Sequence, residues 1–369
     1  MNDLIEEKIQ EGIQKKVFPG CVLLIHTAGK IVFHKAFGSS IVTPLRSKMY
    51  LNTLFDIASL TKPLATTTAI AFLLQEKQLS LGHQLHQIIP SFSGEGKKDI
   101  TLFHLLNHAS GLPAWKPYFE VIAARDAREA GFLGSPEAKQ AVYDMAHQEA
   151  LIAPPGQKNC YSDIGFILLG EVVETVSGLS LDAFFRKYLF THLASEQPFF
   201  QPHAVLQNDA TSFAATQDSA WRKEVIQGRV DDDNAYVMGG VAGHAGLFSS
   251  ALGVYQLVCL WTHSIEGQGF LSPAIASQFV ERQVDEGVPR SSSRGLGWDT
   301  PSYPSSSGRY FSSESFGHLG FTGTSVWVDR KNDLIVIFLS NRVHPLRANE
   351  QIHAFRPELH DLIFEEFVR

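Results

Sequence analysis

The sequence predicts an α+β fold in which strands near both ends of the chain form one sheet and a mainly helical region is inserted between them. Two observations carry this prediction. Paired apolar runs flank a turn near each end of the 369-residue chain, and the sequence between the ends has the periodicity of helices. A sheet assembled from both ends makes the domain boundaries discontinuous.

Each end of the chain contains a predicted β-hairpin. Residues 21–25 and 31–37 are apolar runs around a turn that contains Gly29, where a positive φ costs little. Near the other end, residues 325–328 and 334–339 flank a polar turn. These four runs supply the strands of the expected sheet.

Helices are predicted at both termini and throughout the middle of the chain. Apolar residues recur every four positions from Ile5 to Val17, and a closing helix is expected from residue 357 to 368 with Pro357 in its first turn. Asp163 is a candidate cap and Gly178 a candidate stop for one of the middle helices. The expected middle helices cover residues 64–75, 100–108, 136–151 and 164–177.

Composition excludes several classes of function. Hydrophobic residues make up 44% of the chain and charged residues 19%, as in an ordinary globular protein. The formal net charge of -7 and the absence of a basic patch predict no nucleic-acid partner. Cys21, Cys160 and Cys259 are odd in number and far apart, which indicates free thiols in a reducing compartment.

The N-terminal sequence is charged and lacks an apolar segment of signal-peptide length, and the run of residues 64–74 is too short to span a bilayer. We therefore expect a cytoplasmic protein with no membrane partner. The sequence leaves the oligomeric state open.

The strongest local motif is Ser59-Leu60-Thr61-Lys62, which opens an apolar helix. Residues three apart share a helix face, so Lys62 can reach the Ser59 hydroxyl and serve as the base that a serine nucleophile needs. Backbone N–H groups at the helix start lie where an oxyanion would develop. Alone, the motif also fits a serine cap and a surface lysine.

Two further segments strengthen this hypothesis. Tyr161-Ser162-Asp163 lies at a loop-to-helix junction, where a tyrosine hydroxyl can act as an acid–base group or simply pack. The segment from His318 to Ser325 places Gly320 and Gly323 before a strand, where a ligand can lie against the backbone.

The ordered combination of these motifs resembles the β-lactamase and penicillin-binding-protein superfamily, near its class C enzymes, serine esterases and D-amino-acid peptidases. The similarity extends over nearly the whole chain, including residues 101–112, 234–248 and 295–298. It implies an antiparallel sheet flanked by helices beside an all-α domain, with the active site at their junction. We place these domains at residues 1–58 with 215–369 and at residues 59–214.

The resemblance also implies roles for particular residues. Ser59 would be the acylated nucleophile, Lys62 its general base or proton shuttle, and Tyr161 a second proton-transfer group that titrates together with Lys62. The N–H groups of Ser59 and Phe321 would form the oxyanion hole. No cofactor and no metal are expected.

The chain departs from the superfamily pattern at two motifs. Leu319 in His318-Leu319-Gly320 replaces a hydroxyl that often helps to hold a substrate carboxylate, and a histidine binds an anion less dependably than a lysine. Asp163 replaces an asparagine, so that it would accept a hydrogen bond from the substrate or from Lys62, or cap its helix. His244 is expected to be structural.

The leading hypothesis is a cofactor-free hydrolase that attacks a small ester or amide through a Ser59 acyl-enzyme. Its substrate would be a carboxylic ester, or an amide of a cell-wall fragment. A β-lactamase is the least favoured of the catalytic alternatives because those drugs act outside the cytoplasm. A non-catalytic ligand-binding member of the fold is the alternative from another class.

Overall fold

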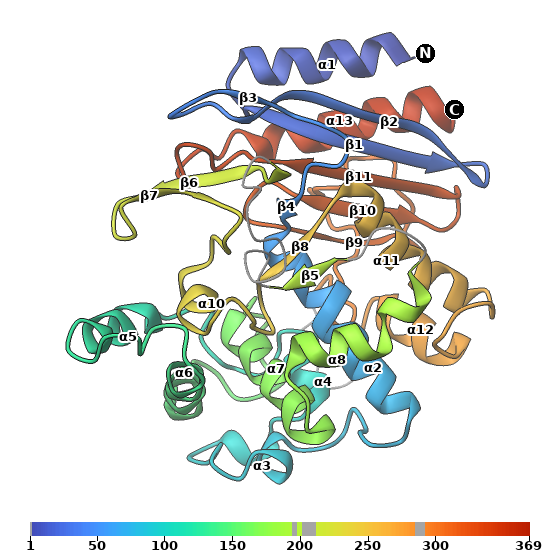
Figure 1. Cartoon of the computed structure of the whole chain (residues 1–369). Coiled ribbons are helices and arrows are strands. Elements are labelled where there is room, and N and C mark those ends of the chain that lie inside the picture. Colours follow the sequence, from blue (N-terminus) through green and yellow to red (C-terminus); the bar gives the residue numbers. More distant parts are fainter. Residues whose placement is uncertain (1, 194–197, 201–211, 285–291) are drawn as a thin grey trace.

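The computed structural model describes residues 2–193, 198–200, 212–284 and 292–369 (Figure 1). Its main sheet is antiparallel and has the strand order β3-β2-β1-β11-β10-β9, so β1 and β11 join the two ends of the chain at the centre. Both predicted hairpins are present. The strands are β1 (Gly20–Thr27), β2 (Lys30–Ile41), β3 (Ser47–Lys48), β9 (Phe316–Leu319), β10 (Ser325–Asp329) and β11 (Leu334–Ser340).

The two terminal helices cover one face of this sheet. α1 (Asn2–Gln14) and α13 (Ile352–Phe367) lie side by side there, and a core cluster that includes Ile5, Phe18 and Phe338 fills the space beneath them (Figure 1). The prediction that the last helix begins at Pro357 is wrong, because Pro357 lies inside α13. The buried side chains of Ile352 and Phe355 hold the additional first turn against the sheet.

The opposite face of the sheet contacts the helical part of the chain. α11 (Ala251–Ile265) packs on β1 and β11, and α12 (Pro273–Val280) packs on α11. One continuous apolar cluster runs from the inner side of the sheet, at residues such as Val22 and Ile337, into the helical region. Antiparallel strands with helices on both faces confirm the α+β prediction.

The middle of the chain is mainly helical, with small sheets at its border. α7 begins at Asp163 and ends before Gly178, whose φ of +68° stops the helix as predicted. The predicted cap was wrong: the Ser162 hydroxyl accepts the hydrogen bond from the helix N–H, at 3.1 Å from Gly165 N. The helices are α2 (Thr68–Gln75), α3 (Leu85–Ile88), α4 (Leu102–Leu106), α5 (Tyr118–Asp126), α6 (Pro136–Gln148), α7 (Asp163–Ser177), α8 (Leu181–Tyr188) and α10 (Asp233–Val237).

Short strands and helical turns lie between the main sheet and the helical middle of the chain. β4 (Phe55–Asp56), β8 (Leu247–Ser249) and β5 (Phe199–Phe200) form a three-stranded sheet, and β6 (Ala215–Ser219) pairs with β7 (Glu224–Gln227). The turn η1 (Ala58–Leu60) follows β4 and leads into a π-helix, η2 (Lys62–Thr67), which continues as α2. The remaining short helices are η3 (Lys97–Asp99) and η4 (Phe190–His192).

No single helix in the described part of the chain is long and apolar enough to cross a membrane. The segments Asp163–Ser177 and Leu181–His192 reach the required length and composition only as a pair, and they are bent by 65° with respect to each other.

Candidate active site

Ser59 lies in a turn that several hydrogen bonds hold in place. Ala58 has a φ of +48°, which is uncommon for a residue other than glycine, and its N–H donates to the Asp56 carboxyl at 2.8 Å. From the segment after β9, the Thr322 hydroxyl donates to the Asp56 carbonyl at 2.8 Å, and the Thr324 hydroxyl donates to the next carbonyl at 3.1 Å. The turn before Ser59 is thus fastened to the main sheet.

Lys62 is fully buried, and its amine has two hydrogen-bond acceptors and one carboxylate partner. Its Nζ lies 2.9 Å from Ser59 Oγ and 3.2 Å from the carbonyl oxygen of His244. It also forms an ion pair of 2.7 Å with Asp163 Oδ1. The surroundings therefore fit the charged form of the amine.

The net electrostatic effect on Lys62 agrees with these contacts. Burial lowers the pKa of Lys62, but the charges of Asp163 and Tyr161 and hydrogen bonds to both raise it, and the net shift is upward. A lysine can act as a simple base only when its pKa is lowered, so the upward shift argues against that role for Lys62. The ammonium form prevails at neutral pH because Asp163 compensates its charge.

Tyr161 lies beside the amine of Lys62, two residues before the start of α7. The Lys62 Nζ is 4.9 Å from the centre of the Tyr161 ring. The His108 ring packs against Tyr161 at 4.5 Å between centroids, and His108 Nδ1 accepts a hydrogen bond of 3.0 Å from Ser162 N. Burial, with the positive charges of Arg294 and Lys62, keeps the pKa of His108 well below its usual value. A neutral histidine therefore supports the tyrosine.

The third predicted segment, from His318 to Ser325, begins at the end of β9 and lies beside the Ser59 turn. A Cβ atom on Gly320 would be 2.0 Å from Thr324 Oγ1 and 2.6 Å from the Ile57 carbonyl oxygen. Only glycine lets the two backbone segments approach this closely. Next to it, the Phe321 N–H donates to no backbone carbonyl in the described residues, and Phe321 as a whole residue is 45% exposed.

His318 is buried and neutral. Burial and the charges of Arg294 and Lys62 hold the pKa of His318 well below its ordinary value. Its Nδ1 is 2.8 Å from the Leu319 carbonyl oxygen, which places the ring proton on Nδ1 and leaves Nε2 as an acceptor. A cationic His318, which the sequence allows, does not occur near neutral pH in this environment.

All of the predicted site residues except Lys62 line one cavity of about 590 Å³, and Lys62 lies directly behind Ser59. Trp115 and Arg294 line it from other parts of the chain. Within the described residues, Phe321 is the only phenylalanine in its wall. The predicted residues lining the cavity are Ser59, Tyr161, Asp163, His318, Gly320 and Phe321.

Sequence reasoning missed the partnership of His244 and Asp232. His244 Nε2 is 2.8 Å from Asp232 Oδ1, and the same carboxylate caps α10 by accepting from Ala235 N at 2.8 Å. Burial would raise the pKa of Asp232, but the charge and hydrogen bond of His244 lower it overall. His244 also lines the cavity, so the expectation of a structural role stays a prediction, while its carbonyl oxygen contacts Lys62. The sequence feature that could have indicated this contact is the run of three aspartates, Asp231 to Asp233.

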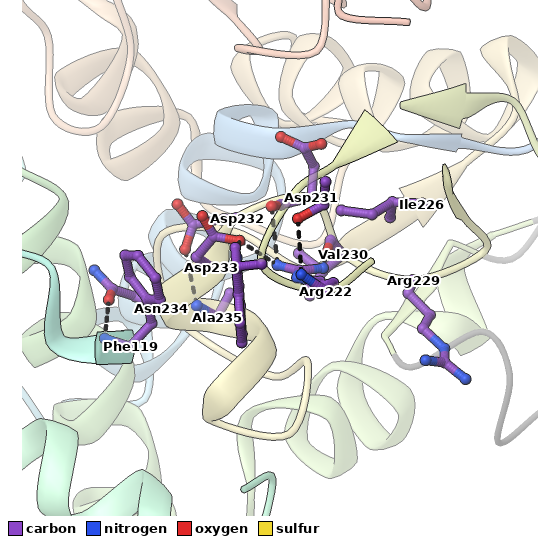
Figure 2. Close-up of polar contacts among 12 residues, drawn as sticks. Phe119, Arg222, Ile226, Arg229, Val230, Asp231, Asp232, Asp233, Asn234 and Ala235 are labelled. Carbon is purple, nitrogen blue, oxygen red and sulfur yellow. Dashed lines mark hydrogen bonds and ion pairs between the residues drawn. The ribbon is translucent and has the colours of Figure 1, made fainter. Parts of the chain in front are cut away.

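Asp231 and Asp233, on either side of Asp232, hold the segment that contains them against the turn before Ser59. Figure 2 shows Arg222 bonded to Asp233, at 2.6 Å, and to the carbonyl oxygens of Val230 and Asp231, at 2.7 and 3.1 Å. The N–H of Asp231 donates to the second oxygen of Asp56 at 2.6 Å. Burial raises the pKa of Asp56 to about 7.

No group of three or more His, Cys, Asp or Glu side chains suited to holding a metal ion occurs among the described residues. His83, which is three residues before His86, accepts a hydrogen bond from Ser80 N at 3.2 Å. His104 forms a capping box with Thr101 at the start of α4. These histidines act in local structure.

Comparisons with known proteins agree with this fold. The chain is 28% identical over 91% of its length, and over 82% of the relative, to a Salmonella typhimurium protein that is provisionally named a D-alanyl-D-alanine carboxypeptidase. Two similar solved structures are each 22% identical. EstCE1, a hydrolase with promiscuous acyltransferase activity, has a TM-score of 0.71 over 96% of this chain and 97% of that one. The octameric penicillin-binding protein homologue from Pyrococcus abyssi has a TM-score of 0.72 over 98% of this chain and 77% of that one.

A class C β-lactamase has a TM-score of 0.69 at 16% identity, over 98% of this chain and 97% of that one. These structural similarities confirm the predicted β-lactamase/transpeptidase-like fold. The family profile named Beta-lactamase matches residues 5–358, almost the entire chain. The protein is therefore a serine hydrolase that belongs to the beta-lactamase family.

Proposed function

We propose that the protein hydrolyses a small ester or amide through an acyl-enzyme on Ser59. The observation that carries the proposal is the 2.9 Å contact between Lys62 Nζ and Ser59 Oγ in a cavity that Tyr161 also lines. A serine, a buried amine and a phenol at one site provide a nucleophile and two groups that move protons.

The charge state of Lys62 shapes the proposed proton path. An ammonium has no lone pair, so Lys62 can accept the Ser59 proton only as it releases another. We propose that it passes this proton to the phenolate form of Tyr161 while Ser59 Oγ attacks the carbonyl carbon. Tyr161 then protonates the leaving group. In the second half of the cycle Tyr161 removes a proton from the water that attacks the acyl group, and that proton returns through Lys62 to Ser59 Oγ as the acyl group leaves.

The N–H groups of Ser59 and Phe321 are the proposed oxyanion hole. The hydroxyls of Thr322 and Thr324 fix the relative position of the two segments that carry these donors. Donors that are fixed before the reaction stabilise developing charge without reorganising.

Two substrate classes remain in the proposal. A carboxylic ester fits the promiscuous acyltransferase activity of EstCE1, whereas the name of the Salmonella relative favours a peptide that ends in D-alanine. Neutral His318 and the apolar Leu319 disfavour efficient β-lactam hydrolysis, since neither supplies a cation or a hydroxyl for the drug's carboxylate. A non-catalytic binding protein would not need the contacts around Lys62.

We propose that the protein works in the cytoplasm on a small molecule, without a cofactor and without a nucleic-acid or membrane partner. The free cysteines Cys21, Cys160 and Cys259 support a reducing compartment, and the net charge of -7 disfavours phosphate backbones.

The test compares hydrolysis of p-nitrophenyl butyrate with release of D-alanine from N-acetyl-D-alanyl-D-alanine, in the wild type and in Ser59→Ala. We expect turnover of at least one of the two, lost by about 10³-fold or more in the variant. Turnover of the ester alone would identify an esterase, and release of D-alanine would identify a carboxypeptidase. Turnover that survives in Ser59→Ala would refute the assignment of the nucleophile.

A further inference from the structure

A second cavity, of about 560 Å³, lies at the far end of the strands that lead to the Ser59 site. The Thr324 hydroxyl, just before β10, donates to the turn that precedes Ser59. At its other end, β10 places Val328 and Asp329 in the wall of the second cavity, which α11 also lines. No described residue lines both cavities, so a ligand in the second one would not be the substrate at Ser59.

Part of the wall of the second cavity is apolar and aromatic. Val328 and Ile335 belong to the core cluster on the inner side of the sheet, and Tyr255 of α11 lies beside that cluster. The Tyr255 hydroxyl is engaged with the Cys259 thiol, and burial raises the pKa of Tyr255, so the ring stays neutral. The face of a neutral aromatic ring attracts organic cations, and the aliphatic side chains favour a cation that carries methylene groups.

The polar part of the wall is predominantly acidic. Hydrogen bonds from neighbouring residues already occupy the carboxylate of Asp329. Asp333 is fixed by a 2.8 Å hydrogen bond from Gly29 N, which joins the two hairpin turns. The exposed side chains of Glu266 and Glu314 form no hydrogen bond and no ion pair within the described residues. Three carboxylates therefore remain for a positively charged ligand. The charged groups that line the cavity, apart from two histidines, are Glu266, Glu314, Asp329, Asp333 and Arg330.

His26 places a polar side chain at the edge of the core. It follows Leu24 by two residues on β1, so it lies on the same inner face of the sheet, and it is only 9% exposed. Its ring lies 5.5 Å from the Tyr255 ring, between centroids. His26 Nδ1 has no hydrogen-bond partner in the described part of the chain, since Asp333 Oδ1 is 3.9 Å away. Buried polar atoms are rarely left unpaired, so this ring indicates a partner that a bound molecule supplies.

We infer that this second cavity binds an aliphatic polyamine. Its ammonium groups pair with Glu266, Glu314 and Asp333, and its methylene groups lie against the apolar wall and the Tyr255 ring. The volume is that of a small-molecule site. A metal ion fits less well, because no metal-binding group of side chains occurs among the residues that the structure describes. The inference is independent of the proposed function.

Titration calorimetry on the full chain tests this site. Spermidine is compared with 1,8-octanediol, an uncharged chain of similar length, and with magnesium chloride. The buffer contains about 150 mM salt, at which the attraction between exposed charges is largely screened. We expect spermidine to bind at least tenfold more tightly than either of the other two, and to raise the melting temperature of the protein.

Two double variants separate the cavity from the overall charge. Glu266→Gln with Glu314→Gln removes two carboxylates from the wall and should weaken spermidine binding at least tenfold. Glu76→Gln with Glu95→Gln is the matched control, because both residues are exposed and line neither cavity. It changes the net charge by the same amount and should bind spermidine like the wild type. Tyr255→Leu, which removes the aromatic face, should also weaken binding.

A wild type that does not bind spermidine would overturn the inference. So would an equal loss of affinity in both double variants, because that result indicates a general attraction to the net charge of -7. Magnesium that binds as tightly as spermidine and competes with it would identify a metal site instead. Octanediol that binds as tightly would identify an apolar pocket, and either result would overturn the assignment to a polyamine.

Discussion

Asp163 forms a 2.7 Å ion pair with the buried amine of Lys62, and this contact keeps the lysine charged. Burial alone would lower the pKa of Lys62, so the direction of the net shift depends on the carboxylate. The aspartate that departs from the superfamily pattern thus sets the protonation state of the proposed proton shuttle.

Asp163→Asn should move the alkaline limb of the pH profile to lower pH, because the proposed shuttle works from the ammonium form of Lys62. The variant loses the negative charge that raises the pKa of Lys62, so the amine deprotonates at a lower pH than in the wild type. The measurement is kcat/KM for an ester between pH 5 and pH 10. A limb that stays in place, or that moves to higher pH, would show that Asp163 does not control Lys62.

Asp56→Asn should alter how stability depends on pH. The pKa of the buried Asp56 carboxyl is raised to about 7, so the folded state holds its proton more tightly than the unfolded chain does. Its contribution to stability is therefore largest at acid pH. That contribution declines as the pH rises from about 4 to about 7, by at most about 1.4 kcal/mol per pH unit.

Urea unfolding of the wild type and Asp56→Asn at several pH values between 4 and 8 measures this difference. The free energy of unfolding of the wild type, relative to that of Asp56→Asn, should fall across this range and then level off. A difference that is constant with pH would mean that Asp56 titrates normally despite its burial.

Asp232→Ala should weaken both the fold and the site. The substitution removes the partner of His244 and the cap of α10. An unpaired buried hydrogen-bonding group costs about 1–3 kcal/mol and a lost helix cap about 1 kcal/mol. His244 is then freer to shift its carbonyl away from Lys62, so kcat should fall as well. Asp232→Asn keeps the cap and should recover part of the stability; equal losses in both variants would argue against the His244 contact.

How far the sequence predicts this molecule depends on the range of the interactions. Apolar periodicity and turn residues predicted both hairpins and the helices around Thr68 and Ile164, because these patterns are local. The start of α13 was missed because the packing of Ile352 and Phe355 outweighs the usual placement of a proline such as Pro357.

The site shows the same limit. Spacing alone brings Ser59 and Lys62 together on one helical turn, and the resemblance to a family added Tyr161. The contact of Lys62 with the His244 carbonyl and the bond between Asp231 N and Asp56 join residues 182 and 175 positions apart. Neither contact leaves a pattern in a single sequence, and a raised pKa for Lys62 follows only from the folded geometry.

Gly320→Ala should impair activity more than an ordinary glycine substitution does. A Cβ atom at this position collides with Thr324 and with the backbone before Ser59, so the segment that carries Phe321 must move. We expect kcat to fall by about 10–100-fold, as for the loss of one oxyanion donor. Gly82→Ala, where the added atom meets nothing within 4 Å, is the control, and an equal effect of both would contradict this account.

The most direct test of the central claim is intact-protein mass spectrometry after exposure to a fluorophosphonate, which labels activated serines. The account predicts a single adduct on the wild type, no adduct on Ser59→Ala, and slow labelling of Lys62→Met, which cannot shuttle the proton. Ser302→Ala, at a serine outside the cavity, should label like the wild type. An adduct that persists on Ser59→Ala, or a wild type that takes up no label, would contradict the assignment of Ser59 as the nucleophile.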